Sequence, residues 1–250
     1  MRTYLSVLLI CFPLSTFATT EASITPSPDK PSIEKKYKVP PYNATYTLLH
    51  KSDPVGEATR KLTYLDNGNA VYHYETDIEW LIFSDKRSET STLSIQQDQV
   101  TPLHYLYDRE GTGRDKHYEW QYQFSNKSAK DLVKNKTITI DRHEGLQDKL
   151  SYHLQNRIDL INNPEQQRFV YPVISTSGSI KDYVYTYDGE EELMLPYGLV
   201  KTIRLKREIP EKKRITYAWF APKLDYLLVK LYQVKAGAEQ FEAQLSKIEQ

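Results

Sequence analysis

Charged side chains that could transfer protons gather at one point of the chain, the run Asp141-Arg142-His143-Glu144. An imidazole beside carboxylates can act as a general acid or base. The side chains of adjacent residues diverge, however, and a charged loop ahead of a helix explains the run more simply. Asp141, His143 and Glu144 therefore qualify as catalytic residues only if the fold brings them together in a pocket, and the same holds for His117 with Glu119.

Four potential metal ligands occupy every second position of one segment. They are His73, Glu75, Asp77 and Glu79. Imidazole nitrogen and carboxylate oxygen can hold a divalent ion. The residues between them are mostly apolar, so the alternation predicts a strand whose polar face is in solvent. We expect no metal site there and no cofactor. The chain also contains no nucleophile elbow, phosphate-binding glycine loop or zinc-protease motif.

Aromatic residues alternate with polar ones in several segments, and tyrosine is abundant, with 20 copies in 250 residues. A buried tyrosine contributes apolar area but needs a partner for its hydroxyl group. A face lined with tyrosine therefore suits a partly wet groove for an amphipathic ligand, although a packed core is the simpler interpretation. The predicted ligand contacts are Tyr118, Trp120, Tyr122, Tyr183 and Tyr185.

The elements that must position these residues are mainly strands, because hydrophobicity alternates with a period of two. Turn residues such as Asn67-Gly68 and Asp188-Gly189 separate the runs at short spacing. About a dozen strands joined in this way predict an antiparallel meander. Residues 148–162 change to a helical period, and Asn162-Asn163-Pro164 ends the pattern. One helix amid many strands predicts a strongly curved sheet or half-barrel that closes around a packed amphipathic helix.

The N-terminal segment has the layout of a cleaved signal peptide, residues 1–18. A short apolar run, Leu5–Pro13, is followed by small residues before a cut near Ala18. Residues 19–41 are rich in proline and predict a disordered tether, and residues 42–250 form a single β-rich domain. Cys11 lies inside the apolar run without the small residue expected before a lipidated cysteine, so we expect a soluble periplasmic protein rather than a lipoprotein.

Composition excludes several classes of function. The chain balances 33 basic residues against 33 acidic ones, which argues against a nucleic-acid partner. Its apolar runs are shorter than the roughly 20 residues of a membrane-spanning helix. Cys11 is the sole cysteine, so cleavage leaves no disulfide and no thiol chemistry.

Several motifs together resemble one bacterial exported family, domain of unknown function 3108. They are Gly56-Glu57-Ala58, residues 83–87 (FSDKR), residues 114–117 (RDKH), the helix after Asp148, and residues 219–227 (WFAPKLDYL). The match runs from about Pro40 to the C-terminus, with Leu228 where the family often has proline. The resemblance implies a Gram-negative periplasmic protein and assigns no activity. The expected fold is also similar to that of periplasmic lipoprotein carriers of the Lol type, an analogy that does not settle function.

Three functions follow from these observations. The first is a non-enzymatic periplasmic carrier that holds a lipid, an acyl chain or an envelope-protein segment on a concave face lined by tyrosine and tryptophan. The second is an envelope assembly factor acting through exposed strand edges. The third is a hydrolase of envelope glycans or lipids. An enzyme is the less expected of these classes, and the partner is an amphipathic ligand or a cell-envelope protein.

Overall fold

The structure is a computed structural model that describes residues 39–250, except residues 81 and 143. The predicted signal peptide, residues 1–18, and nearly all of the predicted tether, residues 19–41, lie outside the described residues. Within the described part of the chain, no helix is long and apolar enough to cross a membrane.

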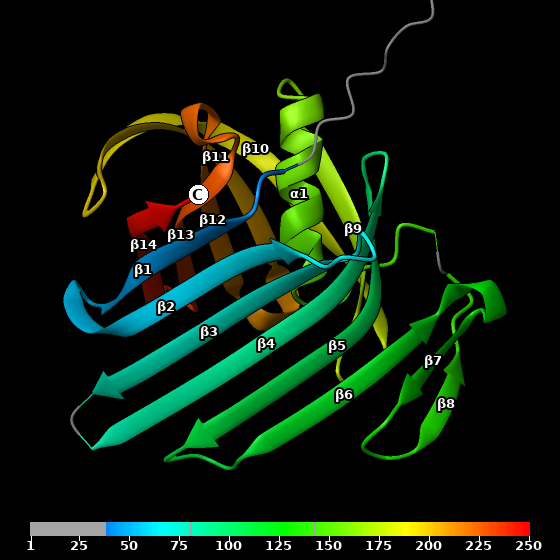
Figure 1. Cartoon of the computed structure of the whole chain (residues 1–250). Coiled ribbons are helices and arrows are strands. Elements are labelled where there is room, and N and C mark those ends of the chain that lie inside the picture. Colours follow the sequence, from blue (N-terminus) through cyan, green and yellow to red (C-terminus); the bar gives the residue numbers. More distant parts are fainter. Residues whose placement is uncertain (1–38, 81, 143) are drawn as a thin grey trace, which may run out of the picture. The chain divides into compact units, whose positions relative to one another are not determined.

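One antiparallel sheet of 14 strands makes up almost all of the fold (Figure 1). The strands are β1 (Tyr42–His50), β2 (Asp53–Tyr64), β3 (Ala70–Trp80), β4 (Phe83–Gln96), β5 (Gln99–Gly111), β6 (Lys116–Gln123), β7 (Ser128–Asp131), β8 (Lys136–Thr139), β9 (Arg168–Ile174), β10 (Ile180–Leu195), β11 (Gly198–Ile209), β12 (Arg214–Ala221), β13 (Leu227–Lys235) and β14 (Ala238–Glu249). The helix α1 (Ser151–Asn162) follows β8. The predicted mainly-β meander with one helix is confirmed.

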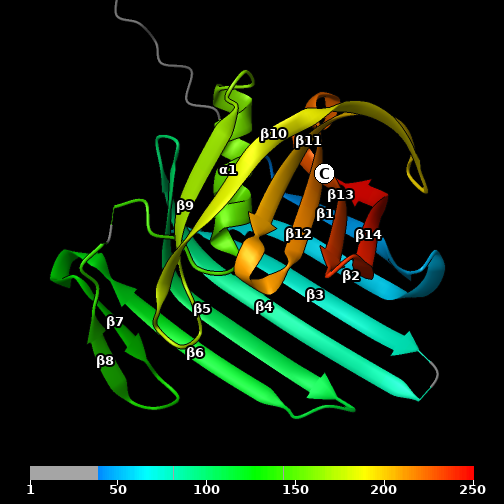
Figure 2. The ribbon, with the colours of Figure 1, turned by 180° about the vertical axis from the view of Figure 1, so that it is seen from behind.

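The order of the strands in the sheet is β8 to β1 followed by β14 to β9. Each strand therefore pairs with its neighbour in sequence, except that β1 pairs with β14 across the middle of the sheet. Among the described residues, β8 and β9 do not pair, so the sheet stays open at this point. The connection between these two edge strands carries α1, which stands beside β9 and β10 in both views (Figures 1 and 2).

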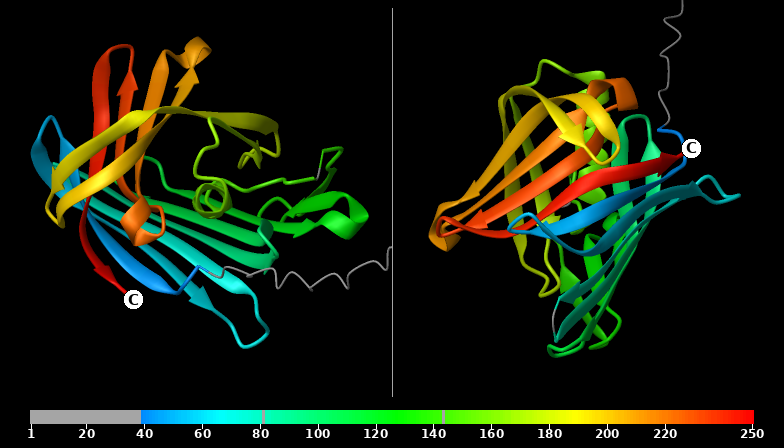
Figure 3. Two further views of the ribbon diagram at one scale, coloured as in Figure 1. Left: turned by 90° about the horizontal axis from the view of Figure 1, so that it is seen from above. Right: turned by 90° about the vertical axis from the view of Figure 1, so that its left-hand side faces the viewer.

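The sheet curves around α1, and Figure 3 shows the helix end-on inside this curve. The face toward α1, here called the inner face, carries the buried residues of each alternating strand. In β1 these are Tyr42, Ala44, Tyr46 and Leu48. Their register continues across β2 and β3, where Tyr42 pairs with Leu62 and Leu62 with Tyr72. The alternation in the sequence thus places one apolar row of each strand against the helix.

The helix begins at Ser151, three residues after the predicted start at Asp148. Residues 148–150 form the turn before it, because the Asp148 carboxylate accepts hydrogen bonds from the N–H groups of Leu150 (2.8 Å) and Ser151 (2.6 Å). Asp148 therefore satisfies donors that a helix start otherwise leaves without partners.

The polar side chains of α1 contact the sheet and loops rather than bulk solvent. Gln155 accepts a hydrogen bond from the N–H of Val100 (2.7 Å) and donates one to the carbonyl of Asp98 (2.8 Å). Arg157 donates to the carbonyl of Asp225 (2.8 Å). The amphipathic pattern of α1 therefore reflects an apolar side in the core and a polar side that holds backbone groups of the surrounding strands.

Candidate functional site

A cavity with both apolar and polar walls lies on the inner face, here called the inner cavity, and has a volume of about 330 Å³. Strands β1–β4, the start of α1 and the β13–β14 hairpin contribute its walls. The lining residues are Leu48, Val55, Arg60, Tyr74, Thr76, Ile78, Arg87, Glu89, Lys149, Leu150, His153, Leu231, Gln240 and Phe241. Its size falls within the range of small-molecule sites, which combine apolar walls with a few polar groups.

Arg60 is the most unusual residue of this cavity. Its position in β2, paired with Ala44 of β1 and Tyr74 of β3, directs it to the inner face, and its side chain is 5% exposed. No acidic side chain of the described residues forms an ion pair with it, and its Nε has no hydrogen-bond partner. The guanidinium carbon instead lies 5.0 Å from the ring centre of Tyr74 and 5.9 Å from that of Tyr72.

The acidic side chains near the cavity are engaged with other partners. Asp85 accepts hydrogen bonds from Arg87 (2.7 and 2.9 Å) and from Arg109 (2.7 and 3.0 Å), which hold the pKa of Asp85 near 2 against the opposing effect of burial. Glu89 accepts a hydrogen bond from the Tyr105 hydroxyl (2.6 Å). Neither of these two carboxylates forms an ion pair with Arg60.

His153 lies on the helix side of the same cavity. Burial, together with the charges of Arg60 and Arg207, lowers the pKa of His153 well below its usual value. The imidazole is therefore neutral at physiological pH and can offer one donor and one acceptor. Arg60, Lys149 and Arg87 then leave the cavity lining with more positive than negative charge.

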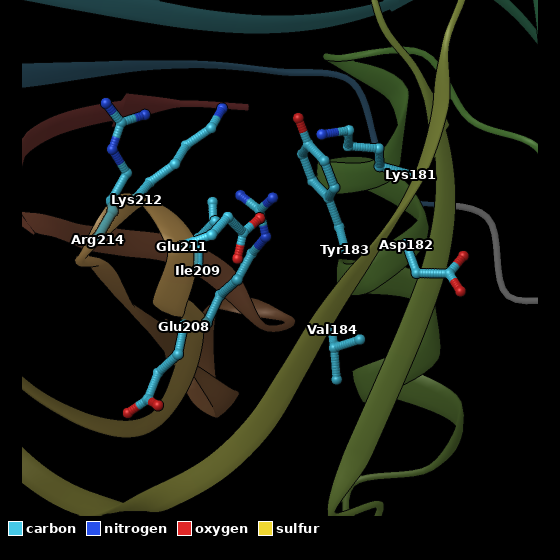
Figure 4. Close-up of a pocket in the computed structure, with 10 residues that line it drawn as sticks. Lys181, Asp182, Tyr183, Val184, Glu208, Ile209, Glu211, Lys212 and Arg214 are labelled. Atoms are coloured by element: carbon cyan, nitrogen blue, oxygen red, sulfur yellow. The ribbon is translucent and has the colours of Figure 1, made fainter.

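A second cavity of about 290 Å³, here called the wedge pocket, opens where β10 separates from β11 (Figure 4). Pairing between these strands begins at Thr186 and Lys206, so Tyr183 pairs only with Tyr171 of β9. Lys181 and Tyr183 project from β10 on one side of this opening, and Lys212 and Arg214 lie across from them (Figure 4).

A third hollow lies on the opposite, outer face of β11–β14 and has a volume of about 520 Å³. Trp219 forms its floor, with the Arg204 guanidinium 5.9 Å and the Lys230 ammonium 5.0 Å from the ring centre. The indole N–H donates to Glu191 (2.6 Å). The neighbouring Phe220 points the other way, into the core beside α1.

The five predicted contact residues occupy two places on the inner face. Trp120 and Tyr122 are buried in the main core, and Tyr118 beside them is half-buried. Tyr185 is buried against α1, where its hydroxyl lies 3.5 Å from that of Tyr152. Tyr183 lines the wedge pocket, with the Arg207 guanidinium 3.4 Å from its ring centre.

The predicted catalytic candidates that the structure describes are partly or fully exposed. Asp141 and Glu144 are exposed, and His143 lies outside the described residues. His117 bonds Asp108 (2.6 Å) while Glu119 bonds His104 (2.8 Å), so these two residues have separate partners. Within residues 39–250, apart from the two gaps, no group of three or more histidine, cysteine and acidic side chains could hold a metal ion.

Arg60 is not among the site residues predicted from the sequence. The alternation Ala58, Arg60, Leu62 in β2 is sufficient to find it, because it places a guanidinium in line with two apolar residues on the buried face. The predicted site residues are acids, imidazoles and aromatic rings, whereas Arg60 is a cation at a core position.

A solved structure supports the fold. A crystal structure of a β-barrel-like protein of domain of unknown function DUF1849 from Brucella abortus is similar with a TM-score of 0.54 and 8% identity, covering 84% of this chain and 97% of that one. An exported protein with a YmcC-like fold from Bacteroides fragilis (10% identity, 84% and 94% covered) and a lipoprotein from Parabacteroides distasonis (8% identity, 84% and 96% covered), each so described provisionally, both reach a TM-score of only 0.31.

The sequence itself gives the family. No curated protein matches the chain. The model of one family matches residues 41–244, which include nearly all of the sheet, the helix and the inner cavity. The chain therefore belongs to the family described as Protein of unknown function (DUF3108).

Proposed function

We propose that this protein is a non-enzymatic carrier of the bacterial periplasm that binds an amphipathic ligand in the inner cavity. The observation that carries the proposal is the cavity itself, about 330 Å³ of space between the curved sheet and α1. A pocket of this size that opens to solvent and has mixed apolar and polar walls is typical of small-molecule binding sites. The periplasmic location rests on the predicted signal peptide.

The lining of the cavity supports a ligand with two chemical ends. One wall of the cavity is apolar and consists of Leu48, Val55, Ile78 and Phe241. Arg60 lies four residues further along β2 than Gly56, the residue that pairs with Ile78. Apolar walls favour an alkyl chain, since each buried methylene contributes about 0.8 kcal/mol. The polar groups of β2–β4 and α1 favour a head group at the other end.

The predicted aromatic contacts fit a ligand longer than the cavity. One row of residues crosses β2–β6, because each member pairs with the next across neighbouring strands. Its members are Arg60, Tyr74, Glu89, Tyr107 and Tyr118. We propose that the head-group end of such a ligand continues along this row toward Tyr118, while its alkyl chain lies against the apolar wall. Trp120, Tyr122, Tyr183 and Tyr185 are then the further proposed contacts on the inner face.

Blocking the cavity tests this proposal. Ile78→Trp places an indole in the space, and we expect it to weaken the binding of the neutral fluorescent probe N-phenyl-1-naphthylamine at least ten-fold. Ile215→Trp is the matched control, because Ile215 is also a part-buried strand residue and does not line the inner cavity. Equal binding by both variants and the wild type, or no binding by the wild type, would overturn the proposal.

A further inference from the structure

We infer that the inner cavity receives the oxyanion head of its ligand, a carboxylate or a phosphate, and that Arg60 binds this group. The inference rests on the proposed function, since it specifies the ligand of the same cavity. It starts from Arg60, whose side chain is at least nine-tenths buried, lines the cavity and lacks a charged partner among the described residues.

An unpaired buried guanidinium needs a compensating group. Arginine stays protonated in proteins, so it cannot escape burial by losing its charge. The rings of Tyr72 and Tyr74 attract the cation, but such contacts recover only part of the cost of desolvating it. The Nε of Arg60 has no hydrogen-bond acceptor. The free fold is therefore incomplete at this position, and a bound oxyanion would complete it.

Nearby protein carboxylates do not fill this role. Tyr74 stands between Arg60 and Glu89 in the register of β2–β4, and Glu89 already accepts the Tyr105 hydroxyl. Asp85 is held by two other arginines. Arg60 thus lines the cavity without an ion pair to any acidic side chain of the described residues, which leaves it able to bind an external anion.

Neighbouring donors complete the receptor. Thr76 also lines the cavity, and its buried hydroxyl has no hydrogen-bond partner. Lys149, next to the start of α1, adds a second cation to the lining. A carboxylate or phosphate offers several acceptor lone pairs, and guanidinium matches either of them in a bidentate geometry.

The order of residues along the strands sets the direction of the ligand. Gly56 pairs with Ile78, and Arg60 lies four residues further along β2, a span of about 13 Å. At the Gly56 end the cavity is bordered by Leu48, Val55 and Phe241, next to the exposed Gln240. The head group therefore lies deep beside α1, and the alkyl chain runs outward to the rim at β14.

Matched amphiphiles test the inference. The wild-type protein is titrated with dodecanoate, dodecyl phosphate and neutral dodecanol, each competing with N-phenyl-1-naphthylamine at pH 7.5. We expect one of the two anions to bind at least ten-fold more tightly than dodecanol. The tighter of the two identifies the source of the head group as a fatty acid or a phosphate ester.

Variants of Arg60 locate the effect. In Arg60→Gln the preference for the anion should fall to less than two-fold, with the affinity for dodecanol unchanged, and Arg60→Lys should restore part of the preference. Arg207→Gln, which removes another guanidinium placed over a tyrosine ring, should keep the full preference. If Arg60→Gln fails to fold, the wild-type ratio of anion to alcohol binding still decides the question.

The outcomes separate the two proposals. Equal affinity of the wild type for anions and dodecanol overturns the anion receptor and leaves the carrier function standing. A preference that persists in Arg60→Gln also overturns the role of Arg60. Failure of all three amphiphiles and of the neutral probe to bind overturns the carrier function itself.

Discussion

The side chain of Asp148 links the start of α1 to strand β4 of the sheet. Its carboxylate is fully buried, accepts the N–H groups of Leu150 and Ser151, and accepts the hydroxyl hydrogen of Ser91 from β4. Burial raises the pKa of Asp148 to about 6, although these hydrogen bonds favour the ionised form. The junction therefore contains a carboxyl group that the fold prefers to keep protonated.

This preference predicts a pH effect on stability. The folded state keeps the Asp148 proton up to about pH 6, whereas the unfolded chain releases it near 3.8. Ionisation of this group therefore lowers the free energy of unfolding as pH rises from about 4 to about 6, by about 3 kcal/mol. Asp148→Asn should lose this dependence, which urea unfolding at pH 4 and pH 7 measures.

The exposed Asp182→Asn serves as the control for Asp148→Asn and should follow the wild type at both pH values, because Asp182 pairs with Arg142 at the surface. If the free energies of unfolding of the wild type and Asp148→Asn differ by the same amount at pH 4 and pH 7, the ionisation of Asp148 does not cause the pH effect.

The residue types around Trp120 predicted which face of the sheet each side chain occupies, but not how far the rest of the fold covers it. The alternation around Trp120 correctly placed it and Tyr122 on the inner face. It did not show that their rings would be covered, because the β9–β10 turn that lies over Trp120 comes from distant sequence, where a side chain at Gly178 would meet the indole ring. Burial of this kind depends on tertiary contacts that no local pattern contains.

Among the elements, β2 and β3 lie so close together at Gly56 that a side chain has no room there. A side chain there would place its Cβ 2.0 Å from the carbonyl oxygen of Asp77, and the φ of +155° is one that other residues rarely adopt. This glycine allows β2 to continue past β3 at the rim of the inner cavity, opposite Ile78.

Gly56→Ala should therefore destabilise the protein by at least about 2 kcal/mol, since backbone atoms must move to relieve the contact. Thermal unfolding measures this loss. Gly113→Ala is the matched control, because its φ lies outside the left-handed region and its neighbour is the flexible end of Arg109. A change of under 0.5 kcal/mol in Gly56→Ala would show that β2 and β3 can separate without cost.

The elements themselves were largely readable from the sequence. Turn residues such as Asn67-Gly68 separate runs of period two, and neighbouring runs do pair as hairpins. The start of α1 was placed three residues early because Asp148 and Leu150 continue its apolar and polar pattern into the capping turn. Periodicity shows which side chains share a face, but the backbone hydrogen bonds decide where a helix begins.

At the scale of the whole domain, the pairing of β1 with β14 could not be read from the sequence. The two strands are far apart in the chain, and no local pattern identifies a partner that is not the next strand. The curvature was predicted from the need to cover a single helix, whereas the position of the opening, between β8 and β9, became clear only from the structure.

The same pairing predicts that the domain tolerates a new order of its strands. Asn43 and Glu249 are paired neighbours, so a short glycine-serine linker can join the end of β14 to the start of β1. New ends in the exposed Asp66–Asn69 turn should give a circular permutant that binds the neutral probe as well as the parent does. Its free energy of unfolding should lie within about 1 kcal/mol of the parent's. A permutant with new ends inside β2 should not fold.

The β1–β14 pairing also sets the order of assembly. A chain that is delivered N-terminus first can form the hairpins from β1 to β8 early, but the other edge of β1 stays unpaired until β14 arrives. Gln240 and Phe241 of that strand border the inner cavity, which Arg60 of the second strand lines. The walls of the inner cavity are thus complete only once β14 has paired, and a chain that ends before β14 should not bind the neutral probe.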